Sequence, residues 1–299
     1  MLKPPSLNKG DKIGLAATAR KITFNEISKA VGIIKKQGFV PVYDDDLFAE
    51  DHQFAGSDQL RALKVQQMLD DPEIKAIFSV RGGYGSVRII DLLDFTSFKA
   101  QPKWFVGYSD ISVFHCHINH VLGIQSLHAS MPINFSENTD KALNDLFQVL
   151  TGKHLTYQFD ANRLNRSGST EGILCGGNLS VLYSLMGSNS FPDMEGKILF
   201  LEDLDEYLYH IDRMMVGLKR AGVLSKLKGM IIGSMSDMND NEVPFGKTAY
   251  EIISEAVGNY DYPVCFGFPA GHVDDNRPLI MGGKVKLDVQ DHSQIIFLD

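Results

Sequence analysis

Short apolar runs alternate with helical apolar spacing along the first half of the chain. Residues 12–18 form an apolar run, and residues 23–37 then carry apolar side chains at helical spacing up to Gly38. The alternation continues, with further strands expected at 39–43, 74–80 and 104–108 and helices at 57–69, 86–93 and 111–122. This pattern predicts a mostly parallel sheet with helices on both faces.

The pattern loosens after about residue 134 and then resumes. A helix is expected at 141–150, followed by a polar stretch over 159–170. Beyond it we expect a turn at Gly176-Gly177-Asn178, helices to Gly187 and at 206–221 and 248–257, and strands at 172–175, 197–201, 230–233, 264–266 and 285–289. We therefore predict an α/β protein with an N-terminal domain over 1–135, a linker over 136–170 and a C-terminal domain over 171–299.

Composition narrows the function classes. The 299 residues are 44% hydrophobic, enough for one large core or two moderate ones, and carry a net charge of −8 with Lys and Arg scattered. Phosphate binding needs a concentrated basic face, so no nucleic-acid partner is expected. No apolar run has the length of a membrane span or signal-peptide core, and the three cysteines form no CxxC pair, so we expect a cytoplasmic protein with reduced thiols.

Ser109 lies directly between an expected strand and an expected helix. A serine at such a sharp turn projects from the rim of the sheet, while amide N–H groups at the helix start can face a developing oxyanion. Gly107 supplies the first glycine of the GxSxG pattern, but Ile111 stands in place of the last. The junction is also typical of an ordinary helix N-cap, so the residues alone leave both interpretations open.

A glycine-rich loop, RGGYG at residues 81–85, follows the strand expected at 74–80. Glycines let the backbone approach a ligand closely, and the N–H groups of this loop are available to complete an oxyanion hole. The loop also resembles part of a dinucleotide fingerprint, but Arg88 occupies the position of its third glycine. A plain tight turn is the remaining interpretation. Because this loop and Ser109 both follow parallel strands, we expect them at one rim of the sheet.

Two further candidates, Glu202 and His272, lie in the second half of the chain. Glu202 ends the strand expected at 197–201, where a carboxylate can hold an imidazole in one tautomer, although acidic runs before helices are often solvated surface. His272 lies in a loop with Gly and Pro after the strand expected at 264–266, and such loops often carry catalytic residues. No metal is expected, because the helix histidines lack i, i+4 pairing: His115, His117 and His120.

Seven segments together resemble the LD-carboxypeptidase family, a group of serine peptidases that also contains microcin C immunity proteins. The resemblance covers nearly the whole chain. It runs through residues 10–14 (GDKIG), 54–58 (FAGSD), 81–85 (RGGYG), 107–110 (GYSD), 176–180 (GGNLS), 201–203 (LED) with 211–213 (IDR), and 271–272 (GH). Each segment is common by itself, but seven in this order are specific.

The resemblance implies a flavodoxin-like N-terminal domain, a smaller β-rich α/β C-terminal domain and a homodimer. It implies Ser109 as nucleophile in a strained turn, His272 as general base and Glu202 as orienting carboxylate, with no cofactor. Backbone amides of Asp110 and Gly83 would form the oxyanion hole. Contacts to substrate are expected from the two glycine-rich segments: Arg81, Gly82, Tyr84, Gly176 and Asn178.

The expected substrate is the murein tetrapeptide, which would lose its terminal D-alanine during cell-wall recycling. Microcin immunity proteins instead cleave peptidyl-nucleotides with an added nucleobase-binding loop, whereas this chain is compact and has one tryptophan, Trp104, just before the nucleophile. A third possibility is a nucleotide- or sugar-binding protein that uses its glycine-rich loops without chemistry.

Overall fold

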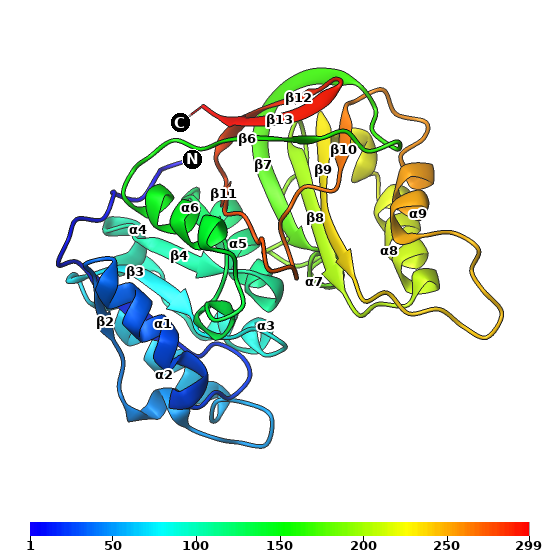
Figure 1. Ribbon diagram of the computed structural model, residues 1–299. Coiled ribbons are helices and arrows are strands. Elements are labelled where there is room, and N and C mark those ends of the chain that lie inside the picture. The colour runs from blue at the N-terminus through cyan, green and yellow to red at the C-terminus, as the bar shows by residue number, and fades with distance from the viewer. Residues whose placement is uncertain (299) are drawn as a thin grey trace.

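The computed structural model describes residues 1–298 and contains two sheets (Figure 1). The first has the order β2-β1-β3-β4-β5, all parallel, with β11 added antiparallel to β5. An order of 2-1-3-4-5 is that of flavodoxin-like, doubly wound sheets, so the predicted fold class is confirmed. The strands are β1 (Lys12–Ala16), β2 (Val40–Val42), β3 (Ile74–Ser79), β4 (Trp104–Gly107), β5 (Ser126–His128) and β11 (Leu279–Met281).

Apolar side chains alternate between the two faces of the first sheet. In β4, Trp104 and Val106 pack into one core cluster and Phe105 into the other. Strands buried on both faces need helices on both faces, and the clusters show which ones cover each. One face carries α1 (Phe24–Lys36) and α6 (Asp140–Leu150). The other carries α2 (Asp58–Asp70), α3 (Ser86–Ile89), α4 (Thr96–Ala100) and α5 (Ser112–His117).

The second sheet is mixed, with the order β10-β9-β8-β7-β12-β13-β6. Its first four strands are parallel: β10 (Val264–Phe266), β9 (Gly229–Ser236), β8 (Ile198–Leu204) and β7 (Gly168–Asn178). Three antiparallel strands extend it: β12 (Lys284–Val289), β13 (His292–Phe297) and β6 (Thr156–Asp160). Helices α8 (Leu208–Arg220) and α9 (Ala249–Ala256) pack on one face, and the short α7 (Leu179–Ser184) follows β7.

Several short helical turns complete the secondary structure. In the described part of the chain, five are 3₁₀ turns and one is a π turn: η1 (Asp45–Phe48), η2 (Ile90–Leu92), η3 (Ser109–Ile111), the π turn η4 (Ile118–Leu122), η5 (Pro132–Asn134) and η6 (Leu224–Lys226). Within residues 1–298 no helix combines the length and the apolar character needed to cross a membrane.

The turn predicted at Gly176-Gly177-Asn178 is wrong, because these residues are the end of β7. Gly176 pairs with Phe200 and Gly177 with Leu201 in parallel register. A side chain has no room at either glycine: a Cβ at 176 would lie 2.1 Å from the carbonyl oxygen of Phe200, and one at 177 would lie 2.4 Å from Ser112 Oγ. The glycines therefore allow close strand and helix packing rather than a reversal of the chain.

The segment 136–170 contains α6, as the sequence predicts, and also β6, which it does not predict. Phe147 of α6 stacks on Phe39 with ring centroids 5.9 Å apart, so this helix belongs to the core of the first sheet. Strand β11 also returns from the C-terminal half to the first sheet, as Figure 1 shows. The two halves therefore exchange elements, and the domain boundaries stay a prediction.

Candidate active site

Ser109 has a left-handed backbone conformation, with φ of 63°. It follows β4 and begins η3, which leads into α5. For an L-residue this conformation costs about 1–2 kcal/mol, and at functional sites such strain is held by the surrounding packing. Gly107, just before it, has no room for a side chain, because a Cβ there would lie 2.8 Å from Cγ1 of Ile111. The local sequence thus forces a sharp turn that presents the serine at the rim of the sheet.

The RGGYG loop packs against this turn. A Cβ at Gly82 would lie 3.4 Å from Ser109 Cβ and 3.5 Å from the backbone nitrogen of Asp110. The missing side chain at 82 leaves space in front of that N–H group, where an oxyanion can be accommodated. The carboxylate of Asp110 accepts a hydrogen bond of 2.9 Å from Ser86 N, which ties the end of the loop to the serine turn. Burial raises the pKa of this carboxyl group.

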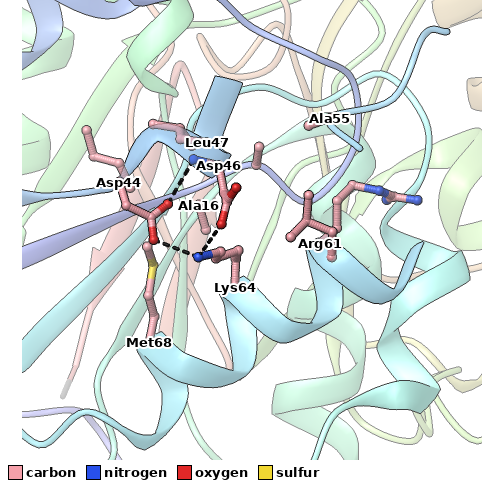
Figure 2. A pocket seen from close by; sticks show the side chains of 11 residues that line it. Ala16, Asp44, Asp46, Leu47, Ala55, Arg61, Lys64 and Met68 are labelled. Atoms are coloured by element: carbon pink, nitrogen blue, oxygen red, sulfur yellow. Dashed lines mark hydrogen bonds and ion pairs between the residues drawn. The ribbon is translucent and has the colours of Figure 1, made fainter. Parts of the chain in front are cut away.

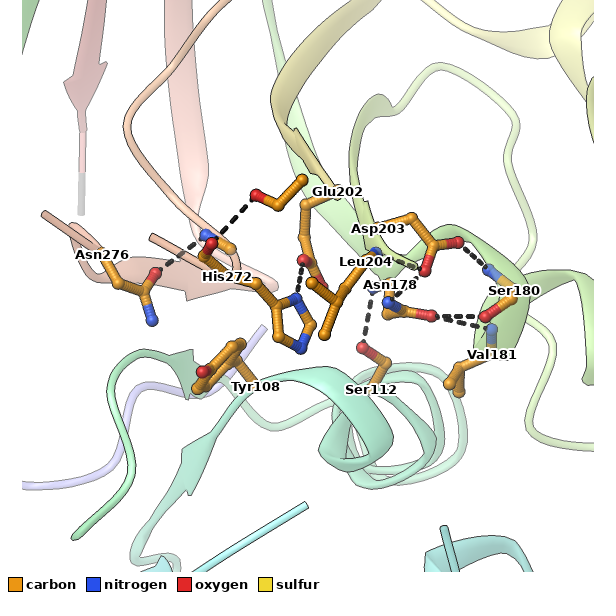
Figure 3. Close-up of polar contacts among 12 residues, drawn as sticks. Tyr108, Ser112, Asn178, Ser180, Val181, Glu202, Asp203, Leu204, His272 and Asn276 are labelled. Carbon is orange, nitrogen blue, oxygen red and sulfur yellow. Dashed lines mark hydrogen bonds and ion pairs between the residues drawn. The ribbon is translucent and has the colours of Figure 1, made fainter. Parts of the chain in front are cut away.

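The side chains of Glu202 and His272 contact each other at the carboxyl ends of the parallel strands of the second sheet (Figure 3). Nδ1 of the imidazole lies 2.8 Å from Oε2 of the carboxylate, which has no exposed surface. Glu202 lies in β8, and His272 lies in the loop after β10. Gly271 makes the contact possible, because a Cβ there would lie 2.6 Å from the same carboxylate oxygen.

Negative charges around His272 raise its pKa more than burial lowers it. Burial lowers the pKa of the imidazole, but the hydrogen-bonded carboxylate of Glu202, with Asp203 and Asp237 nearby, raises that pKa to a net value above the ordinary one. The ring of His272 also packs against the ring of Tyr108, with centroids 4.8 Å apart. Tyr108 directly precedes Ser109, so the imidazole lies beside the strained turn.

One cavity of about 600 Å³ brings most of the predicted residues together. It is lined by Ser109, His272, Arg81, Gly82, Gly83 and Asn178, with Glu202 buried behind the imidazole. Besides Glu202, three predicted residues do not line it: Asp110, whose carboxylate bonds to Ser86 N instead, Tyr84 and Gly176. Tyr84 packs near Phe54 on the outer side of its loop, and Gly176 lies inside the β7–β8 ladder. Within residues 1–298 no hydrogen bond is recorded between Ser109 and His272, so this contact of the triad stays a prediction.

Asp203 is a cavity residue that the sequence did not single out. Its Oδ1 accepts a hydrogen bond of 2.8 Å from Asn178 Nδ2, and its Oδ2 accepts one of 2.9 Å from Ser180 N. Burial, and then the neighbouring charge of Glu202, raise the pKa of Asp203 to about 7. The sequence shows Asp203 only as one member of an acidic run, and nothing in that run marks it as buried.

Asn178 also joins the two halves of the molecule. Its backbone N–H donates a hydrogen bond of 2.9 Å to Ser112 Oγ on α5. Its side-chain oxygen accepts from Ser180 and Val181 at the start of α7, as Figure 3 shows. The end of β7 is thus fixed to the helix that follows the serine turn.

A second, smaller pocket lies at the edge of the first sheet (Figure 2). Its volume is about 20 Å³, which is room for little more than one water molecule. Lys64 spans its mouth with ion pairs of 2.7 Å to Asp44 and 2.6 Å to Asp46. We assign this pocket a structural role. Among residues 1–298 no group of three His, Cys, Asp or Glu side chains is arranged to hold a metal ion.

Comparisons with known proteins agree with this arrangement. The family model of the LD-carboxypeptidase N-terminal domain matches residues 13–129, and that of the LD-carboxypeptidase C-terminal domain matches residues 171–287. The two matches span more than half of the chain. The protein therefore belongs to the LD-carboxypeptidase family.

Relatives with different activities align over nearly the full length. A probable murein peptide carboxypeptidase of Bacillus subtilis is 29% identical over 98% of this chain and 94% of its own. The microcin C7 self-immunity protein MccF of Escherichia coli is 26% identical over 93% of this chain and 91% of its own. The crystal structure of muramoyltetrapeptide carboxypeptidase from Oxalobacter formigenes matches with a TM-score of 0.88 at 27% identity, covering 96% of this chain and 99% of that one.

Proposed function

We propose that the protein is a serine carboxypeptidase that cleaves an L,D-peptide bond and releases the terminal D-alanine of a murein tetrapeptide. The observation that carries the proposal is the placement of a strained serine and a carboxylate-bound imidazole on one cavity: Ser109 with φ of 63°, and His272 at 2.8 Å from Glu202. The proposed roles are those of nucleophile, general base and orienting carboxylate.

The proposed reaction needs no cofactor. His272 removes the proton from Ser109 as the hydroxyl oxygen attacks the scissile carbonyl, and Glu202 stabilises the imidazolium that forms. Backbone N–H groups of Asp110 and Gly83 bind the oxyanion in front of the serine. The imidazolium then protonates the leaving amine of D-alanine, and a water molecule activated by His272 hydrolyses the acyl-enzyme.

The cavity favours a peptide over a nucleotide as the leaving portion. Among residues 1–298 the aromatic rings of its lining are those of Tyr108, 6% exposed, and His272, and the two pack on each other, so this part of the chain offers no free aromatic face to stack on a base. Trp104 is fully buried in the first sheet, where its indole N–H donates to the Pro5 carbonyl. These features support the murein peptide, which is also the substrate class named for the Bacillus and Oxalobacter relatives.

Cleavage of a peptidyl-nucleotide is the second candidate function. It is favoured by the full-length similarity to MccF, whose solved structures include a complex with aspartyl sulfamoyl adenosine. Both candidates use the same proposed triad, so only the substrate distinguishes them. A cytoplasmic setting in cell-wall recycling and a homodimeric assembly remain part of the proposal, since they come from the family resemblance.

The test is release of free D-alanine from a tetrapeptide ending in D-alanine, run beside hydrolysis of a peptidyl-adenylate analogue. We expect turnover of the tetrapeptide by the wild type and none above background by Ser109→Ala. Ser184→Ala, at an exposed position in α7, is the matched control and keeps full activity. Turnover of the analogue alone would transfer the proposal to the second candidate, and undiminished hydrolysis by Ser109→Ala would refute the nucleophile.

A further inference from the structure

Charged residues of opposite sign line opposite walls of the cavity. Arg20 and Arg81 stand on the side of the first sheet, in the loops after β1 and β3. The acidic residues stand on the side of the second sheet, at and after the end of β8: Asp203, Asp205 and Glu206. Strands β1 and β3 flank the switch point of the 2-1-3-4-5 order, which is where open α/β sheets bind ligands.

Most of these charges already have partners. Asp203 accepts hydrogen bonds from Asn178 and Ser180, and Asp205 accepts one of 2.8 Å from Asn239. Glu206 bonds to His210 one helical turn later.

Arg20 and Arg81 differ in whether their side chains have hydrogen-bond partners. Nη1 of Arg81 donates to the Lys21 carbonyl oxygen at 3.2 Å and lies 3.4 Å from Glu26. Arg20 is exposed, and within residues 1–298 no hydrogen bond or ion pair of its side chain is recorded. Of the cations that line the cavity among the described residues 1–298, the guanidinium of Arg20 is therefore the one without a hydrogen-bond or ion-pair partner, and it can bind a ligand.

The side chain of Arg20 crosses the proposed oxyanion loop. A Cβ at Gly83 would lie 2.6 Å from Cδ and 2.7 Å from Nε of Arg20, so the arginine packs directly over the backbone of that glycine. Gly83 has φ of 107°, a conformation that keeps the position free of a side chain. A group bound by this guanidinium would lie beside the carbonyl that Ser109 attacks.

We propose that Arg20 binds the C-terminal carboxylate of the substrate peptide and is the residue that restricts the enzyme to cleavage of the last residue. This inference rests on the proposed function. Only the amide nitrogen and one Cα separate the terminal carboxylate from the scissile carbonyl carbon, so its binding group has to lie next to the oxyanion donors. The planar guanidinium matches a carboxylate with two parallel hydrogen bonds, and the acidic wall opposite repels one.

Steady-state kinetics of wild type, Arg20→Gln and Arg20→Lys test the inference with three peptides. These are a tetrapeptide with diaminopimelate at position three and D-alanine at the end, its C-terminal amide, and a free-acid tetrapeptide with lysine at position three. Arg20→Gln lowers kcat/KM about tenfold to a hundredfold for both free acids and leaves the amide unchanged. Arg20→Lys loses less, because the charge remains without the bidentate geometry.

Lys21→Gln is the matched control. It removes a positive charge one residue away, but that side chain pairs with Glu50 at 2.6 Å and does not line the cavity, so all three rates stay at the wild-type level. Equal loss for the amide and the free acids would mean that Arg20 only supports its loop, and would overturn the inference. A loss confined to the diaminopimelate peptides would assign Arg20 to the side-chain carboxylate and would overturn it too.

Binding keeps this test separate from that of the proposed function. Calorimetry on Ser109→Ala, which does not turn over, compares the free-acid tetrapeptide with its amide. We expect Ser109→Ala to bind the free acid at least tenfold more tightly than the amide. The double variant Ser109→Ala, Arg20→Gln should bind the two peptides equally. If the two variants show the same ratio of affinities for the free acid and its amide, the role of Arg20 is refuted. Release of D-alanine by Ser109→Ala would instead refute the nucleophile, so the two failures can be told apart.

Discussion

Nδ1 of His272 lies 2.8 Å from Oε2 of Glu202, a carboxylate with no exposed surface, and this contact joins a loop after β10 to the end of β8. Because the carboxylate accepts from Nδ1–H, it holds the imidazole in the tautomer that leaves Nε2 free to accept a proton. The same charge helps to raise the pKa of His272, so the contact sets both the orientation and the protonation of the proposed base.

Replacement of Glu202 by Gln is expected to lower kcat about a hundredfold to ten-thousandfold, because the imidazolium loses its counter-charge and the tautomer is no longer fixed. The pH profile gives a second measurement. The base acts in its neutral form, so kcat/KM rises with pH through the pKa of His272 in the free enzyme. Removal of the carboxylate lowers that pKa, so the midpoint of the acidic limb moves to lower pH.

Glu255→Gln is the control for that experiment. Glu255 is an exposed residue that pairs with Lys247 away from the cavity, so its replacement leaves the midpoint in place. An acidic limb that is identical in wild type and Glu202→Gln would show that the carboxylate does not act on His272.

Backbone strain at Ser109 predicts that glycine at this position gives a more stable protein than alanine. With φ of 63°, this position favours glycine, so Ser109→Gly should be more stable than Ser109→Ala by about 1 kcal/mol in urea unfolding. The same pair of changes at Ser184, which ends α7, should give the opposite order, because alanine exceeds glycine in helix propensity by about 1 kcal/mol. Equal stabilities at position 109 would argue against stored strain.

The proposed oxyanion hole depends on the absence of a side chain at residue 82. In Gly82→Ala the new Cβ would have ordinary contacts of 3.4–3.5 Å, so the fold should tolerate it with a change in unfolding free energy under about 1 kcal/mol. The methyl group would nevertheless fill the space before Asp110 N, and kcat should fall about tenfold to a thousandfold. Gly32→Ala in α1, where a Cβ meets nothing within 4 Å, is the matched control with unchanged kcat.

Side chains of the first half of the chain bind the segment that follows His272. Arg277 pairs at 3.0 Å with Asp145 of α6, both side chains being 11% exposed, and Thr139 donates to Asp275. Arg277→Ala leaves Asp145 largely buried without this partner, so we expect a loss of about 3 kcal/mol in chemical unfolding. Lys141→Ala removes only the exposed partner of Asp145, at 3.8 Å, and should cost under about 0.5 kcal/mol.

The first sheet could be predicted from sequence because its main strands are largely apolar and are followed by segments with helical apolar spacing. Strands β5 and β11 were not predicted. They pair with each other across 150 intervening residues or more, and this long-range pairing leaves no local pattern in the sequence. Strand β6 lies in polar sequence and is recognisable only from its place beside β13.

The site residues, like the strands, could be predicted only in part. Ser109, Glu202 and His272 were found because motifs in a fixed order mark them. Arg20 and Asp203 were not, because no local pattern signals that one arginine lacks a partner or that one acid in a run is buried. Those properties arise only when β1, β3 and β8 bring their carboxyl ends to the same cavity.

The most direct test of the central claim is labelling by a serine-directed fluorophosphonate, followed by peptide mapping with mass spectrometry. The account predicts one label per chain, located on Ser109, and its loss in His272→Ala while the fold is retained. Ser184→Ala should label as the wild type does. An unlabelled Ser109, or labelling that proceeds equally without the imidazole at position 272, would contradict the account.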